Sequence, residues 1–135
     1  MLVSDELRVP IVTEVDVVEA RRSGRALAAE LGFGLSDQAL IATAISELAR
    51  NILQYAKRGE LVIGVADNGA GKGISVIAVD QGPGIADPAR AMQDGFSTGS
   101  GLGLGLPGTR RIMDEFELDT AIGRGTRVTV KKWVP

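Results

Sequence analysis

The sequence predicts an α/β fold, a two-layer sandwich of helices and a mixed, mainly antiparallel sheet. Two segments in the first half, 16–31 and 37–57, carry apolar residues at helical spacing. Segments rich in valine and isoleucine follow in pairs, interrupted by glycine-containing turns that are typical of β-hairpins. The chain has 135 residues, of which 44% are hydrophobic, so we expect residues 1–135 to form a single domain with a packed core.

The composition narrows the classes of function. There are 15 Lys and Arg against 17 Asp and Glu, and a formal net charge of −2 gives no basic excess for binding nucleic acid. Cysteine and histidine are absent, which argues against disulfides, thiolate chemistry and a zinc site. The apolar runs are too short to span a bilayer and the first residues are acidic, so we expect a cytoplasmic protein with no membrane or nucleic-acid partner.

The N-terminal quarter predicts a strand followed by a helix. Residues 7–15 are rich in valine and isoleucine, and Pro10 among them favours a strand at the edge of the sheet. Asp16 is expected to cap a helix that ends near Leu31, just before a Gly-Phe-Gly sequence. The three arginines of this helix lie off its apolar face, and we interpret them as a solvated surface, with partner docking as the alternative.

A second helix is predicted at 37–57, with Ser36 as its cap and a broad apolar stripe that reaches Tyr55. Glu47 and Asn51 stand four residues apart near the edge of that stripe, so they share a face and lie one turn apart. A carboxylate and an amide in this position are half-buried polar groups that need partners. Taken alone, the pair also fits an ordinary helix-surface pair, so its interpretation depends on the rest of the chain.

The rest of the chain predicts two hairpins separated by a glycine-rich stretch. The four strands are expected at residues 61–66, 74–80, 117–122 and 126–134. The second of these strands ends directly in Asp80. A short helix is expected at 89–93, and a longer one begins near Pro107, which suits a first helical turn and keeps helical spacing to Phe116.

The glycine-rich stretch runs from Asp80 to Gly108 and opens into the Pro107 helix. A glycine loop that leads into a helix N-terminus is suited to bind phosphate, because free N–H groups and the helix dipole point at the anion. Leucines alternate with the glycines, which a flexible linker would not carry. The P-loop pattern fails because the Gly-Lys pair is followed by glycine, and the G-x-G-x-x-G match from Gly103 to Gly108 lacks a preceding strand. We therefore interpret the stretch as a nucleotide phosphate loop of another type.

Four short motifs occur in a fixed order along the chain. They are Glu47-Leu-Ala-Arg-Asn51 on a helix, Asp80-Gln-Gly-Pro-Gly84 after a strand, Gly101-Leu-Gly-Leu-Gly105 before a helix, and Gly125-Thr126 at the last strand. This ordered set resembles the nucleotide-binding (Bergerat) fold of the GHKL superfamily, which includes gyrase, Hsp90, histidine kinases and MutL. The resemblance runs over nearly the whole chain, and it implies the Bergerat form of the sandwich, with helices on one face of the sheet.

Within this superfamily the chain is most similar to the serine/threonine kinases that control anti-sigma and anti-anti-sigma proteins. More narrowly, it resembles the RsbT-type switch kinases of the bacterial stressosome. The segments that carry this resemblance are 44–52, 80–85, 94–98 and 113–116. The resemblance implies an ATP-dependent protein serine/threonine kinase that phosphorylates a STAS-domain anti-sigma antagonist and switches partners in stress-response signalling. The implied partners are STAS-domain substrates of the stressosome and a phosphatase or similar effector.

The resemblance also implies roles for individual residues. Glu47 would be the general base that takes the proton from the attacking hydroxyl, and Asn51 would give its amide oxygen to Mg²⁺. Asp80 would accept a hydrogen bond from the adenine amino group, and Thr126 would bind adenine directly or through water. Arg50 would steady phosphate charge, or else be a surface or salt-bridged arginine. The backbone of the glycine motifs would pass beside the base or bind the phosphates of ATP, at Gly82, Gly84, Ile85, Gly101, Leu102, Gly103, Leu104 and Gly105.

Other classes of function stay open at this point. A histidine-kinase catalytic domain needs a phosphoacceptor histidine, which this chain lacks, so it would have to act on a partner. Two further alternatives are an anti-sigma factor kinase that binds sigma directly, and a non-catalytic, ATP-dependent docking regulator of a phosphatase. The presence of both Glu47 and Asn51 favours a working enzyme.

Overall fold

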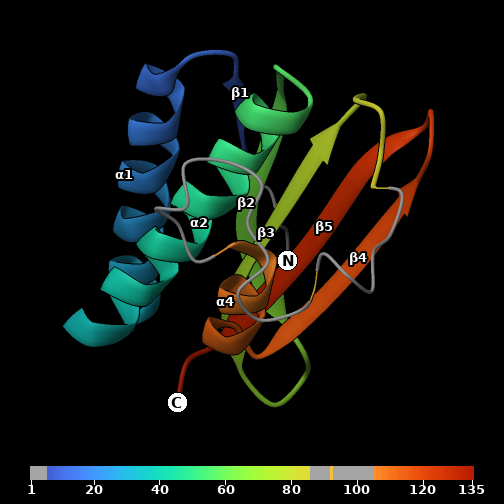
Figure 1. Cartoon of the computed structure of the whole chain (residues 1–135). Helices are drawn as coiled ribbons and strands as arrows, with labels where there is room; N and C mark the ends of the chain where they lie inside the picture. The colour runs from blue at the N-terminus through green and yellow to red at the C-terminus, as the bar shows by residue number, and fades with distance from the viewer. Residues whose placement is uncertain (1–5, 86–91, 93–104) are drawn as a thin grey trace.

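The sheet has five strands in the order β1-β2-β3-β5-β4 (Figure 1). The computed structural model of the chain describes residues 6–85, 92 and 105–135. The strands are β1 Leu7–Ile11, β2 Gly59–Asp67, β3 Lys72–Asp80, β4 Glu115–Ala121 and β5 Gly125–Trp133. The predicted α/β sandwich is confirmed, but every neighbouring pair in the described sheet is antiparallel, so the sheet is not mixed there. Two of these pairs, β2–β3 and β4–β5, are hairpins, which are antiparallel by construction.

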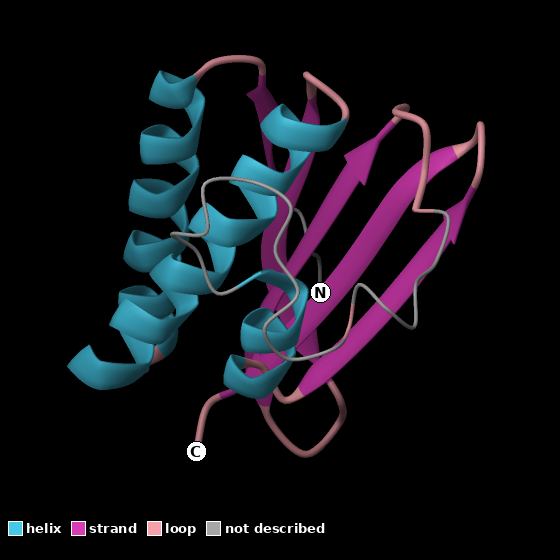
Figure 2. Cartoon of the chain, viewed as in Figure 1, coloured by secondary structure: helices cyan, strands magenta, loops and turns pink. Residues whose placement is uncertain are grey.

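Three described helices cover one face of this sheet (Figure 2). They are α1 Glu14–Leu31, α2 Leu35–Tyr55 and α4 Gly105–Ile112. Helices α1 and α2 pair as a helical hairpin, and α4 packs against α2 beside β5 and β4 (Figure 1). The core lies between the layers and includes Ile41, Ile45, Leu48, Ile63, Val76 and Val130. None of the helices in the described residues is long and apolar enough to span a membrane.

Helix α1 begins slightly before the predicted cap. Thr13 is the N-cap, and Asp16 is the third residue of the helix and the second member of a capping box. The Asp16 carboxylate accepts hydrogen bonds from the backbone N–H groups of Val12, at 2.8 Å, and Thr13, at 3.0 Å. These bonds, led by that of Val12, lower the pKa of Asp16. Asp16 therefore helps to start the helix, although from inside it.

Helix α2 also begins before its predicted cap, so Ser36 lies inside the helix. The reason is the tight turn that precedes it: Gly32 closes α1 with a left-handed φ of 101°, and Phe33 turns directly into the core. At the other end α2 stops at Tyr55, two residues earlier than predicted, because Lys57 has a left-handed φ of 71°.

The helix after the glycine-rich stretch is shorter than its apolar spacing predicted. Helix α4 ends at Ile112, and Phe116 lies in β4. The chain joins the sheet at once, because the backbone N–H of Asp114 already donates to a carbonyl of β5 at 2.9 Å. Pro107 lies in the first turn of α4, as predicted. The short helix expected at 89–93 falls almost wholly outside the described residues.

The strand register places three polar residues in one row near the end of the sheet. Asp80 in β3 pairs with Thr126 in β5, and Thr126 pairs with Thr120 in β4. Paired positions on neighbouring strands point to the same face, and Ala78 and Val128 show that this face is the one under the helices. The row therefore faces the space between the two layers. At the opposite edge of the sheet, β1 with Pro10 pairs with β2, as predicted for an edge strand.

Candidate functional site

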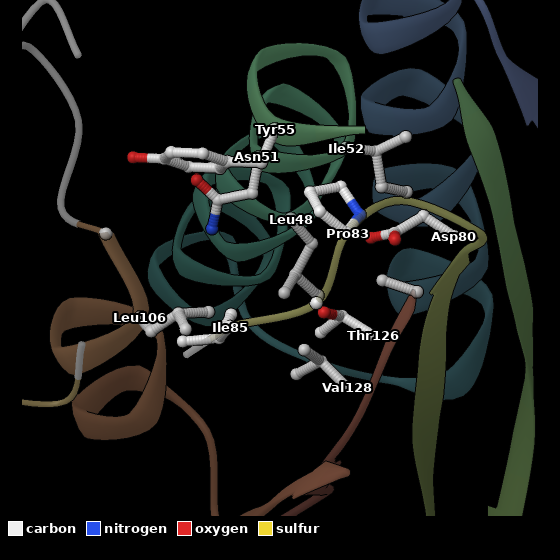
Figure 3. A pocket seen from close by; sticks show the side chains of 13 residues that line it. Leu48, Asn51, Ile52, Tyr55, Asp80, Pro83, Ile85, Leu106, Thr126 and Val128 are labelled. Atoms are coloured by element: carbon white, nitrogen blue, oxygen red, sulfur yellow. The ribbon is translucent and has the colours of Figure 1, made fainter. Parts of the chain in front are cut away.

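A cavity of about 250 Å³ opens between the sheet and the helices α2 and α4 (Figure 3). Apolar side chains from both layers form most of its wall, among them Leu48, Ile52, Ala78, Ile85, Leu106 and Val128. The polar side chains that reach it are few: Asn51 and Tyr55 from α2, Asp80 from β3 and Thr126 from β5. An apolar cavity with a small set of converging polar groups is the usual form of a small-molecule site.

Asp80 presents a hydrogen-bond acceptor at the sheet side of the cavity. It is half-buried, and its Oδ1 accepts a hydrogen bond from the backbone N–H of Gly82 at 2.8 Å. This bond positions the carboxylate and leaves its other oxygen available to a ligand. An ionised carboxylate accepts and does not donate, so this end of the cavity selects a ligand that offers an N–H or O–H group.

Thr126 also presents acceptor lone pairs, because of the bonds that its neighbour makes. The Thr120 hydroxyl donates to the carbonyl of Gly125 at 3.2 Å and accepts from the backbone N–H of Ile85 at 2.9 Å. The Thr120 and Thr126 hydroxyls also lie 2.9 Å apart, and either of them can be the donor in that contact. With the single Thr120 proton on the Gly125 carbonyl, the donor is Thr126. The lone pairs of Thr126 remain for a ligand, next to those of Asp80.

The glycines after β3 are required by protein packing. A Cβ on Gly82 would lie 2.6 Å from the Cβ of Ala56, and Gly82 is not among the residues that line the cavity. Gly84 lines the cavity with a left-handed φ of 80°, but a Cβ there would run into the backbone carbonyl of Ala121. These two positions therefore need glycine for a reason other than the expected approach to a ligand. The loop fits closely against the end of α2 on one side and β4 on the other, and a side chain has no room.

Glu47 lies next to the cavity, at the N-terminus of α4. Its side chain is buried, with 6% of the residue exposed. One oxygen, Oε1, accepts a hydrogen bond from the backbone N–H of Gly105 at 3.2 Å, and the other, Oε2, lies 3.3 Å from Nη1 of Arg50. Gly105 opens α4 with a left-handed φ of 68° and itself lines the cavity. The carboxylate is therefore a paired, buried group, and the alternative of an ordinary helix-surface pair with Asn51 does not hold for Glu47.

The structure gathers the predicted site residues that it describes around one cavity. Glu47 is hydrogen-bonded to Gly105, which lines the cavity. Gly82 belongs to the same loop as Gly84 but packs against Ala56. The predicted residues that line the cavity are Asn51, Asp80, Gly84, Ile85, Gly105 and Thr126. Four predicted residues lie outside the described residues: Gly101, Leu102, Gly103 and Leu104.

Two residues of the site were not predicted from the sequence. Tyr55 was assigned to the buried stripe of α2, but it is 48% exposed and lines the cavity. Thr120 was not singled out at all. It follows Phe116 and Leu118 at the inward positions of β4, and a hydroxyl that interrupts an apolar alternation is the signal that identifies it.

The described residues contain no group of three or more Asp, Glu, His or Cys that would hold a metal ion by themselves. The half-buried Asn51 supplies an amide oxygen at the α2 side of the cavity, the type of ligand that Mg²⁺ and Ca²⁺ accept. This donor set fits a cation that arrives with a phosphate ligand and takes most of its oxygens from that ligand and from water.

Known proteins are similar to this chain in sequence over most of its length. Residues 36–135 match the family model described as histidine kinase-, DNA gyrase B- and HSP90-like ATPase. The chain is 56% identical over 132 residues to the serine/threonine-protein kinase RsbT of Bacillus subtilis (strain 168), which covers 97% of this chain and 98% of that protein. It is 31% identical over 119 residues to the anti-sigma F factor of Thermoanaerobacter sp. (strain X514), which covers 85% of this chain and 83% of that protein.

Two solved structures are similar in fold. One contains the RsbU and RsbW domains of Rv1364c from Mycobacterium tuberculosis, with a TM-score of 0.66 and 20% identity. That similarity covers 98% of this chain and 34% of the other, so this chain spans about a third of that protein. The other is the mycobacterial sensor histidine kinase MprB, with a TM-score of 0.56 and 17% identity, covering 96% of this chain and 99% of that one. At these identities the structures support the fold alone.

The hydroxyl of Thr120 is expected to stabilise the floor of the cavity. Thr120→Val keeps the shape of the side chain but leaves the Ile85 N–H and the Gly125 carbonyl without their partner. Unpaired groups of this kind cost about 1–3 kcal/mol of unfolding free energy. Urea denaturation measures the loss. The matched control is Thr129→Val in β5, on the opposite face of the sheet; equal losses in the two variants would contradict a special role for Thr120.

Proposed function

The chain belongs to the histidine kinase-, DNA gyrase B- and HSP90-like (GHKL) ATPase family, and on this premise we propose that it transfers the γ-phosphate of ATP to a STAS-domain anti-sigma antagonist. It is a serine/threonine protein kinase, of the same kind as the relative with 56% identity. The observation that carries the proposal for this site is the buried Glu47 beside a cavity lined by the motif residues. In this proposal residues 1–135 act as one catalytic domain in the cytoplasm, where ATP is available.

Adenine would bind at the sheet side of the cavity. The amino group of adenine is a donor, and it would meet the free oxygen of Asp80 and the lone pairs of Thr126. Guanine carries a carbonyl oxygen at the same ring position, which would face these acceptors with no proton between them. The flat base would lie between apolar side chains of the two layers, including Leu48 and Val128. These contacts support ATP over GTP as the phosphate donor.

The phosphates would extend toward α2 and the start of α4. Mg²⁺ would neutralise phosphate charge, held by the phosphate oxygens, water and the amide oxygen of Asn51. The first residues of α4, Gly105 and Leu106, line this end of the cavity, so the N–H groups of the first turn would be available to the phosphates. The proposal extends the phosphate contacts to the backbone at Gly101, Leu102, Gly103 and Leu104.

Glu47 would act as the general base. In the structure its Oε1 accepts the Gly105 N–H, which is the same group proposed to bind phosphate. One N–H cannot serve both, so nucleotide binding would draw this donor to the phosphate and free Oε1. The acceptor hydroxyl oxygen then attacks the γ-phosphorus, its proton passes to Oε1, and the bond from phosphorus to the ADP oxygen breaks. The availability of the base is thereby tied to bound ATP.

We propose that the protein substrate and a second partner bind to the same surface in turn. A protein acceptor must bring its hydroxyl beside Glu47, so it must cover the surface over α2 and the start of α4. We propose that a phosphatase or similar effector uses the same surface after the substrate leaves. A relative at 31% identity is named an anti-sigma F factor, so direct binding of a sigma factor is the second candidate. The partner that co-purifies with the protein distinguishes the two.

Asp80→Ala is expected to weaken ATP binding by about 10- to 100-fold, as hydrogen bonds to charged groups are worth about 1.5–3 kcal/mol. Asn51→Ala is expected to weaken it as well, because it removes an oxygen ligand of Mg²⁺. Calorimetry measures the affinity with Mg²⁺ and with a chelator. The Asn51→Ala deficit should shrink without Mg²⁺, whereas the Asp80→Ala deficit should persist because it concerns the base.

A matched control exists for Asp80. Asp67, at the other end of the β2–β3 hairpin, holds the N–H of Gly69 with the same two-residue spacing and the same 2.8 Å distance as Asp80 and Gly82. Asp67→Ala removes an equivalent turn bond away from the cavity. If Asp67→Ala weakens ATP binding as much as Asp80→Ala does, the adenine assignment is wrong.

Glu47→Ala is expected to lower phosphoryl transfer by about 10²–10⁴-fold with ATP binding largely intact, because a general base acts on the acceptor and not on the nucleotide. Labelled ATP and a candidate STAS-domain protein provide the assay, with label sought on Ser or Thr of the acceptor. Glu47→Gln is the sharper variant, since its amide oxygen still accepts the Gly105 N–H but takes no proton. Transfer at the parental rate by Glu47→Gln removes Glu47 from the mechanism.

Phosphorylation is expected to release the substrate. The new phosphate adds about −1.5 to −2 charge next to the Glu47 carboxylate, and repulsion between like charges weakens the complex. Competition binding with the unphosphorylated and phosphorylated acceptor tests this expectation, together with displacement of the acceptor by the phosphatase. Equal affinity for the two acceptor forms, or simultaneous binding of acceptor and phosphatase, would rule out the switch.

A further inference from the structure

Arg50 contacts the proposed general base and is not among the residues that line the cavity. Its Nη1 lies 3.3 Å from Oε2 of Glu47, one helical turn earlier in α2. The Arg50 side chain is 48% exposed, whereas that of Glu47 is 8% exposed. A half-exposed guanidinium therefore contacts a buried carboxylate at the edge of the site. This contact indicates that Arg50 acts on Glu47.

We propose that Arg50 is the positioning residue of the general base: it holds Oε2 of Glu47, so that Oε1 is presented to the hydroxyl of the acceptor protein. The inference rests on the proposed function, in which Glu47 takes the acceptor proton. It deepens that function, because it assigns separate tasks to the two carboxylate oxygens. Arg50 acts through Glu47 and does not contact the reacting atoms.

The need for a second holder follows from the contacts of Glu47. In the structure the carboxylate is held on both sides, by the Gly105 N–H at Oε1 and by Arg50 at Oε2. If the Gly105 N–H turns to a phosphate, Oε1 loses its donor, and the contact with Arg50 remains to restrain the side chain. A general base works within hydrogen-bond reach of the proton, about 2.6–3.2 Å, so a freely rotating glutamate would rarely be in place.

The same residue spacing elsewhere in the protein produces a different contact. Glu19 and Arg22 on α1 also stand three residues apart, but their closest atoms are 3.9 Å apart and their side chains are 58% and 74% exposed. That pair is an ordinary solvated surface pair of small energetic weight. Glu47 and Arg50 approach more closely around a buried oxygen, so burial of the carboxylate, and not the spacing, distinguishes this pair.

A direct role on phosphate is the alternative that the geometry disfavours. The phosphate end of the proposed site is marked by Asn51 and Gly105, both of which line the cavity, and Arg50 does not join them. Its guanidinium already forms a salt bridge with the Glu47 carboxylate. An arginine that bound phosphate would be expected to change nucleotide affinity, whereas a positioning residue changes the transfer step alone.

The test compares Arg50→Met, which keeps an apolar stem without the charge, with Arg50→Lys, which keeps a charge. Phosphoryl transfer to the acceptor protein is measured at varied ATP. We expect Arg50→Met to lower kcat by about 10- to 100-fold, the scale of a misplaced catalytic group, with KM for ATP unchanged. Arg50→Lys should recover much of the lost kcat. The matched control is Arg8→Met on β1, which removes an exposed arginine whose Nη1 lies 3.1 Å from Oε1 of Glu60, and it should behave as the parent.

A double variant separates action through Glu47 from action on phosphate. If Arg50 acts through Glu47, then Glu47→Ala/Arg50→Met should transfer label no more slowly than Glu47→Ala. Thermal unfolding of each variant shows whether it is folded. A slower double variant, a raised KM for ATP, or a folded Arg50→Met with parental kcat would each overturn the inference. If the parent itself transfers no phosphate to the acceptor, the proposed function fails and the inference fails with it.

Discussion

The buried carboxylate of Glu47 is the group on which the arrangement of the site depends. A charge removed from water must be paired, and here the pairing joins two parts of the chain: α2, which carries both Glu47 and Arg50, and the first N–H of α4. The bond to Gly105 fixes where α4 starts, at the end of the cavity where phosphates would lie. The same bond uses the Gly105 N–H, the donor that is proposed to bind a phosphate of the nucleotide. The helix layer is therefore organised around a contact that ATP would be expected to exchange.

The sheet layer has its own central contact, the hydroxyl of Thr120. It connects β4 to the loop after β3 through the Ile85 N–H and to the start of β5 through the Gly125 carbonyl. A further bond from the N–H of Gly123 to the carbonyl of Pro83, at 2.8 Å, fastens the same loop to the hairpin turn. The sheet side of the cavity, where adenine is proposed to bind, is thus held from several directions, with Asp80 at its centre. Rigid placement of a few polar groups is what an apolar cavity needs to discriminate between similar ligands.

The two layers would divide the chemistry of the nucleotide between them. The sheet presents acceptors, the carboxylate of Asp80 and the lone pairs of Thr126, which suit the amino group of a base. The helices present an amide oxygen at Asn51 and the N-terminus of α4, which suit a cation and anionic phosphates. Glu47, the proposed base for proton transfer, lies on the helix side as well, close to where the terminal phosphate would be. In this proposal adenine recognition and phosphoryl transfer would rest on separate elements that meet at the cavity.

The sequence by itself determined the features that depend on near neighbours in the chain. Helical spacing placed Glu47 and Asn51 on one face, Pro10 predicted an edge strand, and the ordered motifs identified the fold and the polar side chains Asn51, Asp80 and Thr126 of the cavity. Tertiary structure decided which groups meet across long separations: Gly105 reaches Glu47 from 58 residues away, and Ile85 reaches Thr120 from 35. It also decided that Tyr55 borders the cavity and that Gly82 packs against Ala56. Periodicity and turn chemistry are local, whereas these contacts depend on how α2 and α4 pack on the sheet, and no local pattern specifies that packing.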